Sequence, residues 1–138
     1  MSTKKSLLKK KKNSLKKKPQ LKPGWYVLRQ DKVKIDTDYI DPVYLFTYTL
    51  VNKAGVEFSF LERFVDDPRY ERTVMFLEYL DSNGFEDVED VIGHYEKVKI
   101  GWKFKDGKKY PSIAPDSRQF ISEAEFNSRE VLDNADPS

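Results

Sequence analysis

The sequence predicts a mainly β domain with one principal helix. Several runs of β-branched and aromatic residues alternate between apolar and polar positions, which is the two-residue period of a strand with one buried face. The spacing of apolar residues changes clearly to a helical period between residues 66 and 84. The six glycines stand singly where the chain is expected to turn. Together these observations favour a small β domain into which a helix is inserted.

Three strands are expected before the helix. The first covers Trp25–Ile35, and the second, "VYLFTYTLVN", covers Val43–Asn52. The third covers Val56–Phe64 and follows a short turn that contains Gly55. The second and third strands are therefore expected to form a hairpin.

The principal helix has recognisable ends in the sequence. Asp66 or Asp67 suits the N-cap position, Pro68 suits the first helical position, and Gly84 suits the point where the helix stops. Residues 85–93, "FEDVEDVIG", are expected to form a short helical turn.

Lysines alternate with apolar residues through "YEKVKIGWKFKDGKKYPSI", residues 95–113. The alternation predicts a fourth strand, and Asp106-Gly107 is a dipeptide favoured in tight hairpin turns. A fifth strand is therefore expected from Lys108 to Ala114, with the lysines facing away from the core. The residues expected to enter the core from the other face of the fourth strand are Val98, Ile100, Trp102 and Phe104.

The order of elements, β-β-β-α-β-β, is that of the five-stranded OB-fold barrel, in which a helix lies between the third and fourth strands. A closed barrel would also leave no exposed sheet edge. An open antiparallel sheet with a helix on one face is the alternative. The expected OB-like domain covers residues 24–121, between a disordered lysine-rich tail at 1–23 and an acidic, partly helical or disordered tail at 122–138.

The net charge of +2 conceals a strong separation of charge along the chain. Residues 1–23 carry ten lysines and no acid, which gives +10. Residues 24–115 carry 13 basic and 17 acidic residues, and residues 116–138 carry two arginines and six acids, so each of these segments has a net charge of −4. A block of lysines attracts phosphates, so a polyanionic partner is expected.

The chain lacks the residues that most kinds of catalytic site require. The chain has no cysteine and a single histidine, His94, so the usual nucleophile–base pairs and histidine–cysteine metal sites are not expected. There is no glycine-rich phosphate loop, and no enzymatic activity, cofactor or bound metal is expected. A metal-dependent nuclease that uses Asp36, Asp38 and Asp41 is the weakest alternative. The absence of cysteine and of a long apolar run favours a cytoplasmic protein without a membrane partner.

Binding of single-stranded nucleic acid needs cations that follow the phosphates and aromatic rings that stack on the bases. In an OB-fold the ligand lies on the second and third strands and on the loop between the fourth and fifth. Phe46, Phe58 and Phe60 are expected in the core instead. The candidate nucleic-acid-binding residues are Lys97, Lys99, Lys103, Lys105, Lys108, Lys109, Tyr110, Tyr44, Tyr48 and Arg63.

The run from Phe76 to Ile113 resembles the C-terminal half of OB-fold single-stranded DNA-binding proteins that phages and mobile elements encode. The shared features are a helix, a glycine, an acidic D-x-x-D-x-(I/L)-G turn at residues 87–93, and a basic alternating strand followed by a glycine turn and a return strand. The resemblance extends over Trp25–Ile121. It implies an OB-fold and a role in replication or recombination of phage or plasmid DNA.

We therefore expect a non-enzymatic protein that binds single-stranded nucleic acid, with DNA as the expected form. The acidic C-terminal tail is the expected contact for a replication or recombination protein. The alternative hypothesis is a protein-interaction module of a mobile element that docks through this tail or through acidic residues of the helix, Glu71, Glu78 and Asp81. Loss of all nucleic-acid binding on removal of residues 1–23 would favour the alternative.

Overall fold

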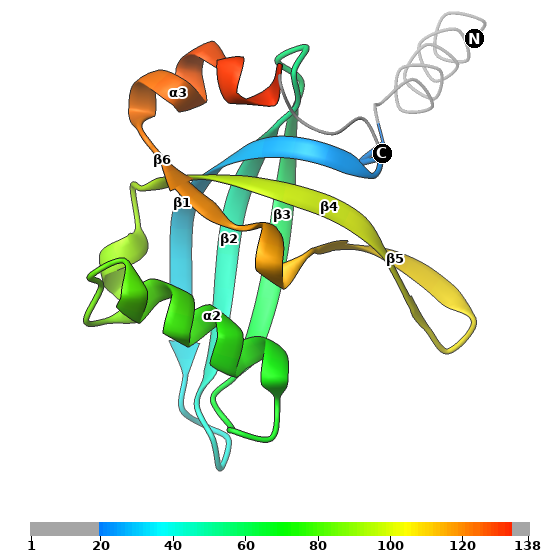
Figure 1. Cartoon of the computed structure of the whole chain (residues 1–138). Helices are drawn as coiled ribbons and strands as arrows, with labels where there is room; N and C mark the ends of the chain where they lie inside the picture. The colour runs from blue at the N-terminus through cyan, green and yellow to red at the C-terminus, as the bar shows by residue number, and fades with distance from the viewer. Residues whose placement is uncertain (1–19, 134–138) are drawn as a thin grey trace, which may run out of the picture.

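Six antiparallel strands form one open sheet in the structure, a computed structural model that describes residues 20–133 (Figure 1). The strands follow the order β3-β2-β1-β4-β5, and β6 pairs with a separate part of β4. In the described part of the chain, the sheet is accompanied by two α-helices and three short 3-10 helices. Within residues 20–133, neither α-helix has the length and apolar composition needed to cross a bilayer.

Five of the six strands lie where the alternation of residues predicts them. The sixth is a strand of only three residues, which a two-residue period cannot reveal. The strands are β1 (Gly24–Asp36), β2 (Val43–Val51), β3 (Glu57–Val65), β4 (Tyr95–Lys105), β5 (Lys108–Ile113) and β6 (Gln119–Ile121).

The expected closed barrel is not formed. Within the described residues, β3 pairs only with β2 and β5 pairs only with β4, so each keeps one edge without a strand partner. β4 pairs with β1 as far as Ile100, and β5 pairs with β4 only from Ile100 onward. β5 therefore belongs to a two-stranded extension that leads away from the sheet, and the alternative of an open antiparallel sheet with a helix on one face is the one observed.

The principal helix, α2 (Glu71–Ser82), begins later than expected. The predicted N-cap was wrong, because the Asp67 carboxylate accepts a hydrogen bond from the backbone N–H of Arg69 and forms an ion pair with its guanidinium. Tyr70 occupies the N-cap position without a side-chain hydrogen bond. The prediction for the other end is confirmed: Gly84 follows the helix with φ of 86°, a conformation that glycine adopts without strain.

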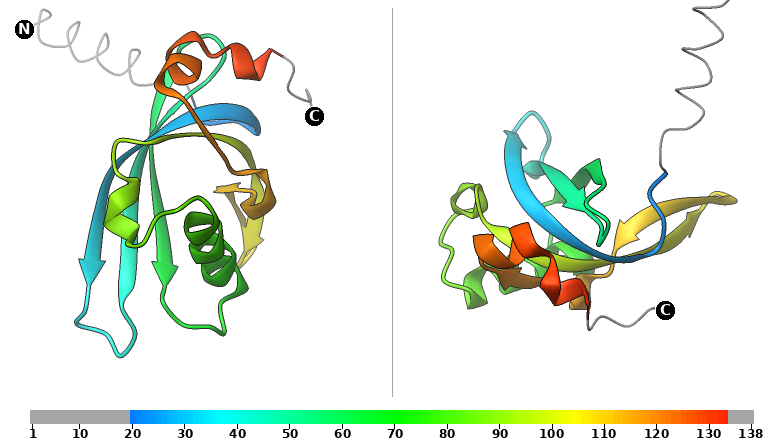
Figure 2. Two further views of the ribbon diagram at one scale, coloured as in Figure 1. Left: turned by 60° about the vertical axis from the view of Figure 1, so that its left-hand side comes forward. Right: turned by 90° about the horizontal axis from the view of Figure 1, so that it is seen from above.

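The main core lies between α2 and the concave side of the sheet, as the left view of Figure 2 shows. Phe76 of α2 stacks on Phe64 of β3 with 4.4 Å between the ring centroids, and it meets Phe46 of β2 edge to face. The short helical turn predicted after α2 is present as η1 (Val88–Val91), and its Val91 is buried in the same core.

Two of the four predicted core residues of β4 are misassigned. Val98 and Ile100 are buried as expected, but Trp102 is 39% exposed and Phe104 is 74% exposed. The reason is the length of β4, which continues past its pairing with β1 and so leaves the region that the core can cover. The alternation of residues persists into this extension, where the core no longer covers the apolar positions.

The opposite face of the sheet carries a second, smaller core. Phe126 of α3 (Glu123–Ser128) packs on Tyr95 of β4 with 4.7 Å between the ring centroids, and Leu132 of η3 (Glu130–Leu132) joins this cluster. Residues 122–133 thus belong to the folded unit, which extends past the boundary expected at residue 121. The predictions for the lysine-rich segment up to residue 19 and for the last five residues lie outside the described residues.

The N-terminus of α3 has a capping box formed by Ser122 and Glu125. The Ser122 hydroxyl accepts a hydrogen bond from the backbone N–H of Glu125 at 3.1 Å, and the Glu125 carboxylate accepts one from the N–H of Ser122 at 3.0 Å. We expect Ser122→Ala to lower the free energy of unfolding by about 1 kcal/mol, the usual cost of losing an N-cap. Urea denaturation measures this change, with Ser82→Ala at the exposed end of α2 as the control. An unchanged stability would mean that α3 does not unfold together with the sheet.

Candidate nucleic-acid interface

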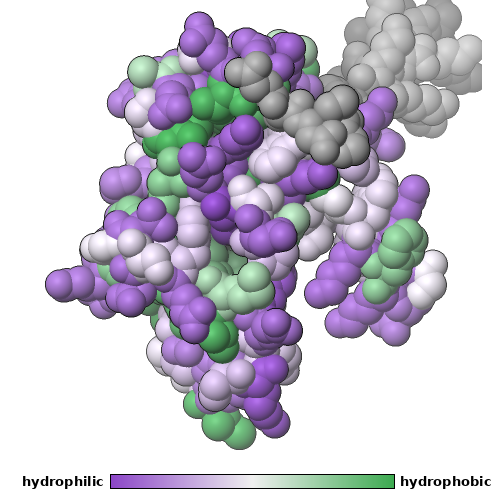
Figure 3. Space-filling model, viewed as in Figure 1, coloured by the Kyte–Doolittle hydropathy of each residue, from purple (hydrophilic) through white to green (hydrophobic). Residues whose placement is uncertain are grey.

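The hairpin of β4 and β5 projects from the body of the protein as a two-stranded ribbon (Figure 1). Every residue from Trp102 to Tyr110 is exposed. Asp106 and Gly107 form its turn with φ of 53° and 73°, the left-handed conformations that tight hairpin turns require. Figure 3 shows this ribbon standing apart from the rest of the surface, with an apolar area surrounded by hydrophilic residues.

The two faces of the ribbon carry different side chains. Residues paired across an antiparallel ladder share a face, and the pairs Lys103–Tyr110 and Lys105–Lys108 lie on one side. We call Lys103, Lys105, Lys108 and Tyr110 the lysine face.

The other side of the ribbon carries the pairs Trp102–Pro111 and Phe104–Lys109. The Lys109 ammonium lies 4.6 Å from the centre of the Trp102 ring, within range of a cation–π interaction. We call Trp102, Phe104 and Lys109 the aromatic face.

The lysine face continues along β4 toward the body of the protein. Lys97 and Lys99 have the same parity in the strand as Lys103, so they point to the same side. Their ammonium groups lie 4.8 and 5.8 Å from the centre of the Trp25 ring, which β1 places opposite Lys99. Gly101 lies between these lysines and the ribbon, and a side chain added there would meet no atom within 4 Å.

Trp25 is a candidate that the sequence analysis did not identify. The residue is partly exposed and stands 72 positions before Lys97, so only the register between β1 and β4 brings the two together. It also lines a hollow of about 430 Å³ with Lys99 and Gly101. The hollow lies beside the lysines and has an indole ring in its wall.

A second groove separates the unpaired edge of β3 from the ribbon. Its volume is about 230 Å³, and its walls bring Arg63 and Phe60 of β3 together with Lys103, Lys105 and Tyr110. We call it the edge groove. It unites four of the sequence-predicted candidates, and one of them, Arg63, comes from a strand that pairs with neither β4 nor β5.

Arg72 of α2 also lines the edge groove and was not predicted. Its guanidinium forms an ion pair with Glu62 and lies 5.1 Å from the centre of the Phe64 ring. The side chain is therefore held in place, with part of its surface open to the groove.

None of the six candidate lysines between Lys97 and Lys109 forms an ion pair within residues 20–133. The segment from Lys97 to Tyr110 contains these six lysines and one aspartate, a net charge of +5. The remainder of residues 24–115 carries seven basic and sixteen acidic residues, a net charge of −9. The positive charge of the folded domain is thus concentrated on one hairpin.

Two of the predicted tyrosines lie elsewhere. Tyr48 is fully buried beneath α2, so it offers no ring face to a base, and burial raises the pKa of its hydroxyl well above the ordinary value. Tyr44 is half-buried on the helix side of the sheet and donates a hydrogen bond to Asp66 at 2.7 Å. Burial and this carboxylate raise the pKa of Tyr44 to about 12. The remaining predicted tyrosine, Tyr110, is 46% exposed on the lysine face.

Tyr48 belongs to a buried ionic network that no local sequence pattern indicates. Arg118, which lies between η2 (Pro115–Ser117) and β6, forms ion pairs with Glu62 of β3 and with Glu96 of β4. Tyr48 donates a hydrogen bond to Glu62 at 2.6 Å, and Tyr79 of α2 donates one to Glu96 at 3.0 Å. Burial alone would lower the pKa of Arg118, but the two carboxylates raise it well above its ordinary value.

The network joins the two halves of the open sheet. β3 and β4 do not pair directly, yet both are bound to the same guanidinium under α2. This bridge ties β3 to the first half of β4, the strand from which the ribbon continues.

Comparison of the sequence with protein-family models and with curated proteins gives no match. Within residues 20–133, no group of three or more acidic or histidine side chains is arranged to hold a metal ion, and this applies also to Asp36, Asp38 and Asp41. The geometry of the ribbon and its surroundings is therefore the basis for assigning a function.

Proposed function

We propose that the protein binds single-stranded nucleic acid, with DNA as the first ligand to test, along the lysine face and the edge groove. The observation that supports this proposal most directly is the position of Tyr110 among Lys103, Lys105 and Lys108 on one exposed face. Unpaired lysines follow a phosphate backbone, and an exposed ring among them stacks on a base. The same side of β4 continues toward the body of the protein with Lys97 and Lys99, and the Trp25 ring lies beside them.

The strand order and the place of α2 between β3 and β4 in the chain support an OB-like barrel that is opened between β3 and β5. In such an arrangement the edge groove occupies the position where the barrel is incomplete. A role in replication or recombination of a phage or plasmid belongs to the same proposal.

The binding test uses the full chain and a chain that begins at Gln20, because Leu21 packs against the core and the Lys22 carbonyl accepts a hydrogen bond from Tyr26. Fluorescence anisotropy with a labelled oligo-dT is expected to show binding by both, with the shorter chain binding more weakly and both losing affinity as salt rises. An absence of binding by the full chain at low salt would refute the proposal. Binding by the full chain alone would assign the activity to residues 1–19.

Replacement of Tyr110 tests the stacking part of the proposal. We expect Tyr110→Ala to weaken oligo-dT binding by about 1–3 kcal/mol, the usual effect of removing one stacked ring, with an unchanged salt dependence. Tyr39→Ala is the control, since Tyr39 is also exposed but lies in the acidic loop between β1 and β2. If the two variants bound oligo-dT with equal affinity, Tyr110 would not be part of the interface.

The acidic residues Glu71, Glu78 and Asp81, which the alternative hypothesis names, are all exposed on α2. Four acidic residues of the C-terminal segment, Glu123, Glu125, Glu130 and Asp133, lie in or directly beside α3 and η3 rather than in a detached tail. A groove with an acidic rim lies on the helix side of the sheet, and it favours a protein contact there.

A further inference from the structure

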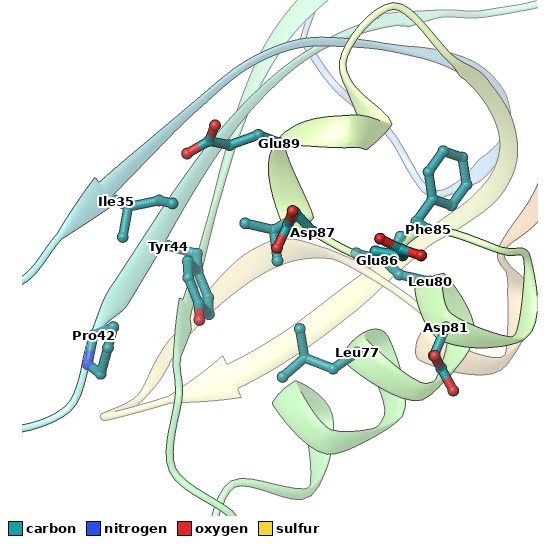
Figure 4. A pocket seen from close by; sticks show the side chains of 11 residues that line it. Ile35, Pro42, Tyr44, Leu77, Leu80, Asp81, Phe85, Glu86, Asp87 and Glu89 are labelled. Carbon is teal, nitrogen blue, oxygen red and sulfur yellow. The ribbon is translucent and has the colours of Figure 1, made fainter.

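A groove of about 620 Å³ opens between the end of β1 and the start of β2 on one side and the C-terminal half of α2 on the other (Figure 4). We call it the acidic groove. Its apolar walls include Ile35, Leu77 and Phe85, and the carboxylates of Asp81, Glu86 and Glu89 stand around them. A ligand that fills this groove must therefore combine an apolar group with positive charge.

The charge around the acidic groove is not neutralised by the folded domain. The bordering segments 36–41 and 77–92 contain nine carboxylates and no lysine or arginine. Within residues 20–133, no ion pair involves Asp81, Glu86 or Glu89. Ile35 is partly exposed and Ile40, in the adjoining loop, is fully exposed, so apolar surface accompanies the acids.

The aromatic face of the ribbon has the complementary composition. It carries two exposed rings on a hairpin with a net charge of +5, and Phe104 is the most exposed of the large aromatic side chains. The lysine face suffices for a phosphate backbone, so these rings have no role in the proposed nucleic-acid contact. A phenyl ring flanked by lysines matches an apolar groove flanked by carboxylates in both apolar character and charge.

The two complementary surfaces cannot meet within one molecule. In Figure 1 the ribbon lies on the right of the sheet, whereas the C-terminal end of α2 and residues 85–91 lie on the left. Two copies can bring them together, because the ribbon projects freely and the groove is open to solvent.

We propose that the β4–β5 ribbon of one copy docks through Trp102, Phe104 and Lys109 in the acidic groove of a second copy. The contact joins different surfaces of the two copies, so each added copy offers a further groove and a further ribbon. The lysine face remains open in this arrangement. Assembly therefore leaves one lysine face open on every copy, and it weakens as salt screens the charges.

Two variants test the contact, one on each side. The ribbon variant carries Phe104→Ser and Lys109→Ala. The groove variant carries Glu86→Lys and Glu89→Lys, and it keeps Asp90, which accepts a hydrogen bond from the N–H of Asp87 at the start of η1. All four positions are exposed, so both variants are expected to fold, and circular dichroism checks this.

Sedimentation at low salt without nucleic acid distinguishes the outcomes. The full-length wild-type chain is expected to exceed its monomer mass of 16.2 kDa increasingly as its concentration rises, and each variant alone is expected to stay at that mass. An equimolar mixture of the two variants retains one intact ribbon and one intact groove, so it is expected to form dimers and nothing larger.

A wild-type chain that stays monomeric at high concentration would overturn the proposal, as would a mixture that does not dimerise. The lysine-rich N-terminal segment is the other basic element that could fill the acidic groove in place of the ribbon. A chain that begins at Gln20 lacks this segment and is the control for it. If this shorter chain is monomeric while the ribbon variant still associates, that segment occupies the groove instead. Oligonucleotide binding plays no part in the measurement, so its result is independent of the proposed function.

Discussion

We expect Arg118→Met to lower the free energy of unfolding by about 3–5 kcal/mol, the usual cost of removing one partner from a buried ion pair. The substitution preserves most of the side-chain volume but leaves Glu96 without a cation and Glu62 with only the Arg72 ion pair. Both carboxylates are almost completely buried, so water cannot replace the lost charge. Urea denaturation followed by circular dichroism measures the loss.

A matched control and a double variant identify the cause. Arg63→Met removes an exposed arginine and is expected to change stability by less than about 0.5 kcal/mol. Glu96→Gln combined with Arg118→Met is expected to be more stable than Arg118→Met alone, because the uncompensated charge is removed. If Arg118→Met behaved like Arg63→Met, the network would not be the bridge between β3 and β4 that the geometry indicates.

Local features of the fold could be predicted from the sequence because they depend on neighbouring residues. Alternation identified five strands, and Asp106-Gly107 and Gly84 identified a turn and a helix end. Each of these signals reports the conformation of a few consecutive residues.

Closure of the sheet could not be predicted in this way. It depends on whether β3 meets β5, and this in turn depends on the path of the extension of β4 and on the bridge through Arg118. Arg118 lies 56 positions after Glu62, so no local pattern connects the two.

The candidate site shows the same division. The hairpin lysines and Tyr110 could be identified because charge and alternation can be read directly from the amino-acid sequence. Tyr48 was misassigned because its burial follows from α2 and Arg118 packing over it, and Trp102 and Phe104 were misassigned because alternation does not reveal where a core ends. Trp25 and Arg72 were missed because their neighbours come from distant segments.

The largest effect on nucleic-acid binding is expected from the triple variant Lys103→Ala, Lys105→Ala and Lys108→Ala. Each phosphate contact to a single strand contributes about 0.7 to the slope of log affinity against log salt, so three contacts contribute about 2. Wild type is therefore expected to lose roughly 20 times more affinity than the variant between about 50 and 200 mM salt. Anisotropy titrations at several salt concentrations give both slopes, in the full chain and in the chain that begins at Gln20.

The control for this variant removes the same charge from another part of the surface. Lys32, Lys34 and Lys53 are exposed on β1 and in the β2–β3 turn, and their replacement by alanine changes the net charge by the same amount. If binding depends on the lysine face, the control keeps the wild-type slope and only the triple variant Lys103→Ala, Lys105→Ala and Lys108→Ala loses it. Equal slopes in the two variants would mean that net charge alone attracts the strand, and the lysine face would then not be the interface.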